Sequence, residues 1–281
     1  MSNTLRIAEL TQIQGPVERD VQNLILDNGN DLNSKRALLK QIVGSGSGAA
    51  NMLAYKEEIT EITADMFASI ADGSFDKVHV GMHYTAASGR KYWLAHADYF
   101  LGSGSTEQTA HHMVVVEDEL SHFEQHQTTN VTTGGASSSL IYTTVLPGIQ
   151  SELETDFGAS HIKQQSLLLS NAVSGDAASG WAWADKKAFL LNARMVFGNP
   201  ICYADPKGEM YNGGNRCSQL ALFRNMPETI IARRKTQQDR YHWWLDDVES
   251  AAYFGAVASD GAANANAASS ARGVRRAFLI G

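Results

Sequence analysis

Histidine and acidic side chains gather in the stretch 111–126, where they could supply metal ligands. The group consists of His111, His112, Asp118, Glu119, His122 and His126. On a helix, His122 and His126 would share one face, a spacing that can hold zinc or nickel. The stretch has no H-E-x-x-H pattern, and the histidine pair at 111–112 directly precedes a β-rich run. We therefore interpret these histidines as packing or surface residues and expect no metal site.

Two cysteines, Cys202 and Cys217, are the candidates for nucleophilic chemistry. Neither lies beside a histidine or a basic pair that would activate a thiolate. A disulfide between them is sterically possible, but a reducing compartment favours free thiols. The serines in 102–105 lie in a loop between expected strands, which is not the strand-turn-helix setting of a nucleophilic serine. We expect no catalytic residue, no cofactor and no enzymatic activity.

The segment 249–272 has the composition of a binding surface. Eighteen of its twenty-four residues are Ala, Ser, Gly or Asn, and such residues with an occasional tyrosine are typical of adaptable recognition loops. We expect the middle of the segment to be displayed, although a plain surface loop would have the same composition. Large apolar residues that we expect in the core frame it, namely Tyr241, Trp243, Trp244 and Leu245 before it and Val274, Phe278, Leu279 and Ile280 after it.

The order of motifs at the end of the chain resembles that of a known family. Trp243-Trp244-Leu245, then Asp260-Gly261, then GVRRAFL at 273–279 is similar to the "WLRS … DG … GVRPAF" ending of C-type-lectin-like domains in phage structural and tail proteins. Arg276 stands where this family usually has proline, and Asp246 where it has arginine. The resemblance covers about residues 75–281, because the segments 75–81, 111–116, 128–135, 157–161 and 171–173 also match in order.

The resemblance implies a C-type-lectin-like fold of the α+β class, in which N- and C-terminal strands pair and residues 246–272 form an exposed face. In relatives that are variable proteins of diversity-generating retroelements, this face is diversified, and the residue types at 249–272 fit that spectrum. The calcium-ligand motifs Glu-Pro-Asn, Gln-Pro-Asp and Trp-Asn-Asp are absent, so we expect calcium-free binding. The expected ligand-binding residues are Asp247, Glu249, Ser250, Tyr253, Phe254, Asn264, Asn266 and Ser269, with Trp243 and Trp244 supporting them from beneath.

The elements that must position this face are predicted from hydrophobic periodicity. Amphipathic helices are expected at 17–25 and 38–43, and a third helix carries an apolar stripe at Ile59, Ile62, Met66, Phe67 and Ile70. A helical face over 141–157 passes through Pro147, which should kink or divide it. A short helix is expected at 217–224, and strands are expected at 77–82, 91–95, 112–117, 187–191, 241–245, 252–257 and 273–280. The order lacks βαβ alternation, which favours an α+β fold over a Rossmann-type sheet.

The chain is predicted to have two parts with different roles. Residues 1–72 are expected to form a helical attachment or oligomerisation region, which would make the protein a homo-oligomer, and specifically a trimer. Residues 75–281 form the lectin-like domain. The basic residues Arg233, Arg234, Lys235 and Arg240 are expected on a solvated surface, and Arg275 in a structural salt bridge.

Charge and hydropathy exclude some partners. The net charge of −7 and a pI near 5.7 argue against nucleic acid, whose backbone is bound by clustered Lys and Arg. No apolar stretch is long enough for a membrane span, and the N-terminus does not have the pattern of a signal peptide. We expect a bacteriophage virion protein that folds in the host cytoplasm, contacts other virion proteins and binds a host-cell surface protein or glycan. The alternative is a purely architectural virion protein whose lectin-like domain contacts only other subunits.

Overall fold

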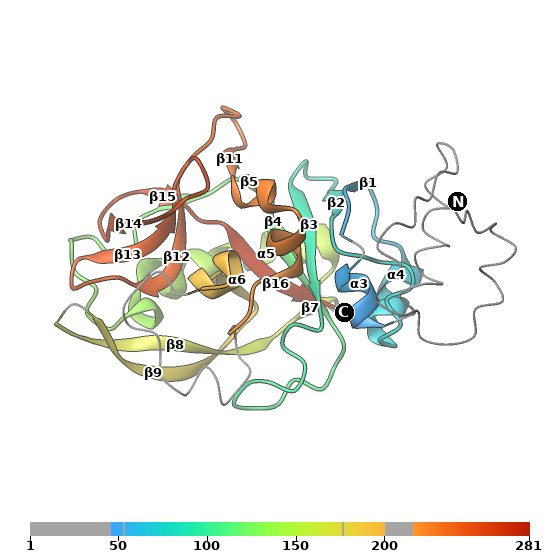
Figure 1. The fold of residues 1–281 in the computed structure, drawn as a ribbon, viewed down its shortest axis with the longest axis horizontal. Coiled ribbons are helices and arrows are strands. Elements are labelled where there is room, and N and C mark those ends of the chain that lie inside the picture. The colour runs from blue at the N-terminus through green and yellow to red at the C-terminus, as the bar shows by residue number, and fades with distance from the viewer. Residues whose placement is uncertain (1–45, 53, 176, 200–215) are drawn as a thin grey trace, which may run out of the picture.

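The computed structural model of the chain describes residues 46–52, 54–175, 177–199 and 216–281. These residues form many strands and a few short helices, which confirms the expected α+β class (Figure 1). The helices expected at 17–25 and 38–43, together with Cys202, lie outside the described residues. No helix in the described ranges is long and apolar enough to cross a membrane.

The larger sheet has seven strands within the described residues, in the order β1-β2-β3-β4-β16-β10, with β7 also paired to β16. The strand at the C-terminus, β16, lies inside this sheet and runs antiparallel to its partners β4, β7 and β10. The resemblance implies that the first and last strands of residues 75–281 pair, but the first of these strands, β2, pairs with β1 and β3 and not with β16. The strands are β1 (Glu57–Ile59), β2 (Met82–Thr85), β3 (Lys91–Ala97), β4 (Met113–Glu117), β7 (Ile162–Lys163), β10 (Ala188–Leu190) and β16 (Arg276–Ile280).

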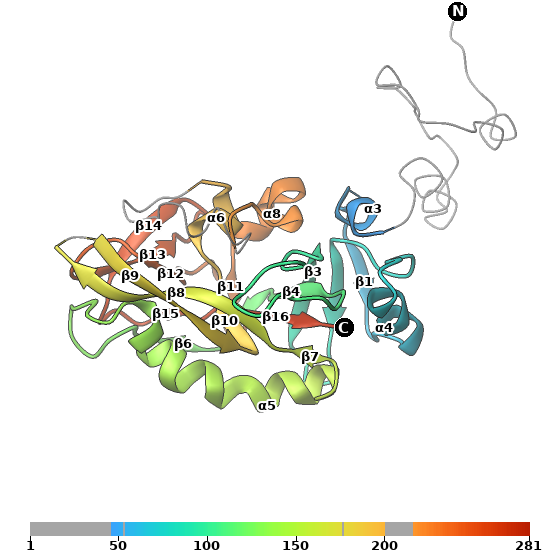
Figure 2. The ribbon, with the colours of Figure 1, turned by 90° about the horizontal axis from the view of Figure 1, so that it is seen from below.

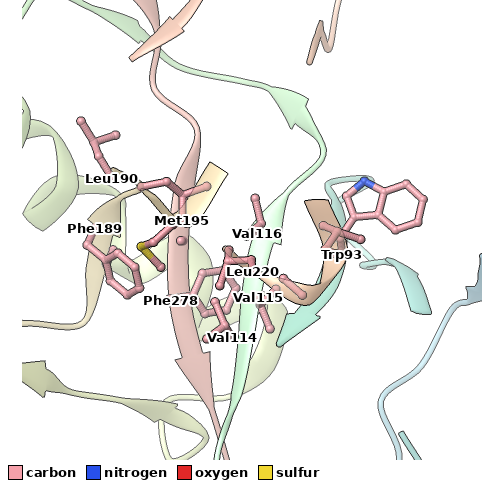
Figure 3. Packing of buried hydrophobic residues seen from close by; sticks show 14 of the residues in the cluster. Trp93, Val114, Val115, Val116, Phe189, Leu190, Met195, Leu220 and Phe278 are labelled. Carbon is pink, nitrogen blue, oxygen red and sulfur yellow. The ribbon is translucent and has the colours of Figure 1, made fainter. Parts of the chain in front are cut away.

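The centre of the core is formed by β4 and β16, in which every residue is buried. Continuous apolar runs of this kind are typical of strands covered on both faces. In Figure 3, Val114, Val115 and Val116 on β4 lie beside Phe278 on β16, with Phe189 of β10 on the other side of that ring. The expected strands at 91–95 and 112–117 are confirmed as β3 and β4.

Helix α5 (Leu146–Phe157) packs along the larger sheet (Figure 2). Its buried side chains include Ile149, Leu153 and Phe157, and the Phe157 ring meets the rings of Tyr92 and Phe278 edge-on, each at 5.0 Å between centroids. Pro147 lies in the first turn of α5, and its nitrogen has no hydrogen to donate to the preceding turn. The π-helical turn η2 (Ile141–Val145) continues into α5 through αR backbone at Val145 and Leu146, so the expected division into two helices is not seen and the helical geometry changes just before Pro147.

Residues 46–72 contact the rest of the described chain on the other side of the boundary expected at 72–75. Strand β1 extends the larger sheet, and Asn51 of α3 (Ser47–Met52) both donates to the Ala97 carbonyl at 3.0 Å and accepts from its N–H at 2.7 Å. The third helix is shorter than expected, because α4 (Ala64–Ala71) begins after Thr63, whose hydroxyl accepts from the Met66 N–H. The apolar stripe packs against the core of its own chain.

The smaller sheet carries the segment with small residues. Its order is β14-β13-β12-β15-β6, and it is built from β12 (Trp243–Val248), β13 (Tyr253–Val257), β14 (Ala263–Ala267), β15 (Arg272–Gly273) and β6 (Phe123–Glu124). The remaining elements are the β8 (Gln165–Ser174) and β9 (Ala177–Lys186) hairpin, the pair β5 (Glu119–Leu120) and β11 (Arg233–Arg234), the helices α6 (Ala193–Phe197) and α8 (Ala221–Asn225), and the 3-10 turns η1 (Ala136–Ser138) and η3 (Pro227–Ile230).

Two expected elements differ from the structure. Of the strand predicted at 77–82, Met82 alone belongs to a strand, β2, and the residues before it form turns and irregular chain. Gly81 adopts φ +91°, where a Cβ atom would lie 2.4 Å from the Tyr55 carbonyl oxygen. The helix predicted at 217–224 begins only at Ala221. Strands β12 and β13 confirm the expectations at 241–245 and 252–257, and the run at 273–280 is divided into β15 and β16.

Two consecutive arginines enter the core at the start of β16, and both side chains are fully buried. Arg276 forms the ion pairs, donating to Glu117 at 3.1 Å and to Glu152 at 2.7 Å. Arg275, which was expected in a salt bridge, instead donates to the carbonyl oxygens of Glu117 and Ile230 and lies over the Trp243 ring. Arg276 is thus a buried charge in the core.

Candidate recognition surface

The register of β13 with β14 divides the small-residue segment between two faces of a sheet. Tyr253 is directly opposite Ala267, whereas Phe254 is opposite Asn266 and Ala256 is opposite Asn264. Residues opposite one another share a face, and successive residues alternate between faces. Tyr253 is 45% exposed and Phe254 is fully buried. The segment is therefore a sheet with one supported face and not a displayed loop throughout.

The supported face is packed on His126, which is fully buried. Its ring stacks on Phe254 at 3.9 Å and meets Trp244 edge-on at 4.7 Å. Nε2 is 3.1 Å from the Leu245 carbonyl oxygen, which it can reach only as a donor. Burial lowers the pKa of His126 to about 3, although this hydrogen bond opposes the shift. His122 and His126 lie on either side of β6 and outside any helix, so the helical pairing considered for a metal is wrong.

Because His126 stays neutral in the folded state, acid should weaken the fold. The unfolded chain takes up a proton below pH about 6.5, and the native site does not, so stability falls as pH drops from there toward 3. The expected contribution is about 1.4 kcal/mol per pH unit within that window. When the free energy of unfolding is measured by urea at several pH values between 7 and 4, it should fall less steeply with decreasing pH for His126→Gln than for the unchanged chain. The glutamine amide can still donate to the Leu245 carbonyl. An unchanged slope would contradict a neutral His126.

The loop 127–133 fixes the edge of the exposed face. The Thr132 N–H donates to the Ala251 carbonyl at 3.0 Å and its hydroxyl to the Ser250 carbonyl at 2.8 Å. The side-chain oxygen of Asn130 accepts from the N–H and the hydroxyl of Ser269. These bonds join three chain segments into one surface, which we call the tip surface. It consists of Asn130, Val131, Ser250, Tyr253 and Ser269.

Three of the eight expected ligand-binding residues lie on the tip surface, namely Ser250, Tyr253 and Ser269. Phe254 and Asn266 are buried, and Asn266 accepts from the Arg272 guanidinium at 2.8 Å, so neither presents a side chain for first contact. Asn264 is exposed on the face opposite Tyr253. Sequence reasoning missed Asn130 and Val131, of which Val131 is 43% exposed.

Of the remaining expected residues, Glu249 is partly buried beside the tip surface, where its N–H donates to the Tyr253 carbonyl at 3.0 Å. Asp247 accepts from the Ala193 N–H at 2.7 Å. Burial and the neighbouring Asp246 charge raise the pKa of Asp247 to about 7. Asp246 is buried and binds both Arg216 and the Tyr142 hydroxyl. This aspartate pair holds β12 in place, and Asp247 belongs to it and not to the exposed face.

A second charged cluster surrounds His83 on β2. Its two ring nitrogens lie 2.7 Å from Glu58 and 3.0 Å from Asp118, and Trp93 donates to Asp118 at 2.8 Å. Burial alone would lower the pKa of His83, but the bonds and charges of the two carboxylates outweigh it and raise the pKa. Because both ring nitrogens are hydrogen-bonded, this imidazole links Glu58 of β1 to Asp118, which follows β4. Neither nitrogen is free to act as a base. Among the described residues, no group of three or more His, Cys, Asp or Glu side chains is placed to hold a metal ion.

One comparison with known proteins gives a match. The model of a family described as a domain of unknown function, DUF6273, matches residues 154–281. The matched region runs from the last turn of α5 to the C-terminus and includes the whole small-residue segment. No curated protein and no solved structure matches the chain.

Proposed function

We propose that this chain is a bacteriophage virion protein whose C-type-lectin-like domain presents the tip surface to a ligand on the host cell. The observation that carries the proposal is the contrast between neighbouring residues on β13. Phe254 anchors the strand in the core, while Tyr253 is 45% exposed on a surface of small side chains. Tyrosine offers contact area at low entropy cost, and serine and asparagine add adaptable hydrogen bonds.

The setting of the tip surface supports a binding role. Its residues are held by backbone hydrogen bonds to β13 and to the loop 127–133, so little ordering is needed when a partner binds. Val131 and Tyr253 provide exposed apolar area, and Asn130 and Ser269 provide polar groups beside it. This mixture suits a protein or glycan surface, and calcium has no part in the proposal. The phage assignment is supported by the ordered motifs that resemble phage lectin-like domains.

The test is binding of purified protein to host cells. Tyr253→Ala should weaken binding about tenfold or more, since exposed aromatic anchors dominate interface energetics. Leu101→Ala is the matched control, because Leu101 is 41% exposed and belongs to the 98–108 loop rather than to the tip surface. Particle assembly should be unchanged in both variants.

The opposite pattern would support the architectural alternative. If substitutions across the tip surface abolish particle assembly and never alter binding to cells, the attachment proposal fails. The lectin-like domain would then contact only neighbouring subunits.

A further inference from the structure

A pocket of about 390 Å³ lies at the other end of the molecule from the tip surface. It is formed where the chain between β1 and α4 passes the end of β2 and the last turn of α5. Figures 1 and 2 both place α4 and β1 at the end opposite β13 and β14. The volume is at the lower end for small-molecule sites and suits a ligand of a few heavy atoms. The pocket is separate from the proposed recognition function.

The aromatic side chains of Phe67, Tyr84 and Phe157 line the pocket. Each of them also contacts another residue of the chain, which holds it in place. The Tyr84 hydroxyl donates to the Asp156 carbonyl at 3.1 Å, and the Tyr84 and Phe157 rings meet edge-on at 5.2 Å. Phe67 stacks on the His161 ring at 3.6 Å between centroids. These contacts fix the walls before any ligand arrives, which lowers the ordering cost of binding.

The charged residues that line the pocket, among the described ones, are Asp156 and Glu61, and the Asp156 side chain is only 1% exposed. Asp156 is already engaged, since it accepts from the Tyr92 hydroxyl at 2.6 Å and lies 3.4 Å from the Arg90 guanidinium. Glu61 is exposed, and no basic side chain in the described part of the chain forms an ion pair with it. Burial raises the pKa of Tyr84, and the charges of Asp156 and Glu61 raise it further. Glu61 is therefore the exposed charge at the pocket, among the described lining residues.

We propose that this pocket binds a small organic ammonium ion, with its methyl or methylene groups against Phe67, Tyr84 and Phe157 and its charge facing Glu61. Aromatic rings attract organic cations through their negative faces, and a carboxylate adds charge without demanding a fixed bond direction. An anion would meet the exposed Glu61 carboxylate and, among the described lining residues, no basic partner. An inorganic divalent ion would need several oxygen ligands, and this pocket is mostly apolar.

The test compares choline with 3,3-dimethyl-1-butanol, its uncharged isostere, by calorimetric titration of the full chain. Choline should bind saturably in the millimolar range or tighter, and the isostere about tenfold or more weakly, because only the cation gains from the rings and Glu61. Equal binding of the two compounds, or no saturable choline binding, would overturn the proposal.

Variants locate the binding in this pocket. Glu61→Gln keeps the shape and should weaken choline binding about three- to tenfold. Phe67→Leu keeps apolar bulk without the ring and should weaken it by a similar factor. The matched control is Glu228→Gln, which removes the same charge from an exposed glutamate lining the cavity beside Trp93 and Asp118. An effect of Glu228→Gln equal to that of Glu61→Gln would show that net charge, not the pocket, governs binding.

Discussion

Replacing Arg276 by methionine is expected to lower the free energy of unfolding by about 3–5 kcal/mol, the range seen when one partner of a buried ion pair is removed. Arg276 is fully buried and donates to Glu117 at 3.1 Å and to Glu152 at 2.7 Å. Glu117 is itself buried and would keep only the Ser121 hydroxyl, at 2.6 Å, as a side-chain partner. A carboxylate left in this state would be strongly destabilising, because the core gives it little solvation.

The pH dependence identifies the cause of that loss. Burial raises the pKa of Glu117 even with the arginines nearby, and losing Arg276 should raise it further. A raised carboxyl pKa means that stability falls as pH rises through it, so the deficit of Arg276→Met should be larger at pH 8 than at pH 5. The double variant Arg276→Met/Glu117→Gln should recover part of the loss at pH 8. Urea unfolding measures all three chains, and a deficit under about 1 kcal/mol at both pH values would contradict a charged core.

The strands and helices that could be predicted from the sequence are those whose residues are continuously apolar or strictly periodic in hydrophobicity. The valine run of β4 and the spacing of Ile149, Leu153 and Phe157 on α5 leave few alternatives, because burial must follow period 2 or 3.6. The β8 and β9 hairpin was missed, since its distal half is exposed and carries no apolar alternation. Strand β14 was missed for a related reason, because the sequence ANANA offers no large side chain to bury.

The candidate site shows a similar division. The composition of 249–272 predicted an unusual surface, and part of it is exposed. The role of the loop 127–133 depends on long-range hydrogen bonds such as that from Thr132 to Ser250, and no local pattern encodes such a bond. The alternation of β13 is encoded locally, because adjacent residues of a strand cannot share a face. That rule alone places Tyr253 and Phe254 on opposite faces, whatever contacts the two side chains make.

Substitutions of the neighbouring residues Phe254 and Tyr253 on β13 are therefore expected to differ strongly in their effect on the free energy of unfolding. Phe254→Ala should lower the free energy of unfolding by about 3–5 kcal/mol, as for other buried phenylalanines. The Phe254 ring is fully buried and stacks on His126 at 3.9 Å. Its removal therefore leaves a cavity next to His126, whose ring also contacts Trp244, and His126 loses its stacking partner. Tyr253→Ala should change stability by no more than about 0.5 kcal/mol, because Tyr253 is 45% exposed. Both variants can be compared by urea unfolding at pH 7.

Phe254→Leu completes the comparison, because it retains most of the buried volume and loses only the stacking on His126. Its deficit should fall between those of the two alanine variants. If Tyr253→Ala destabilised the chain as much as Phe254→Ala, both residues would be structural and the tip surface would lose its anchor. A stable Tyr253→Ala chain with weakened binding to cells would instead separate the two roles, since β13 would then hold the fold through one face and contact a ligand through the other.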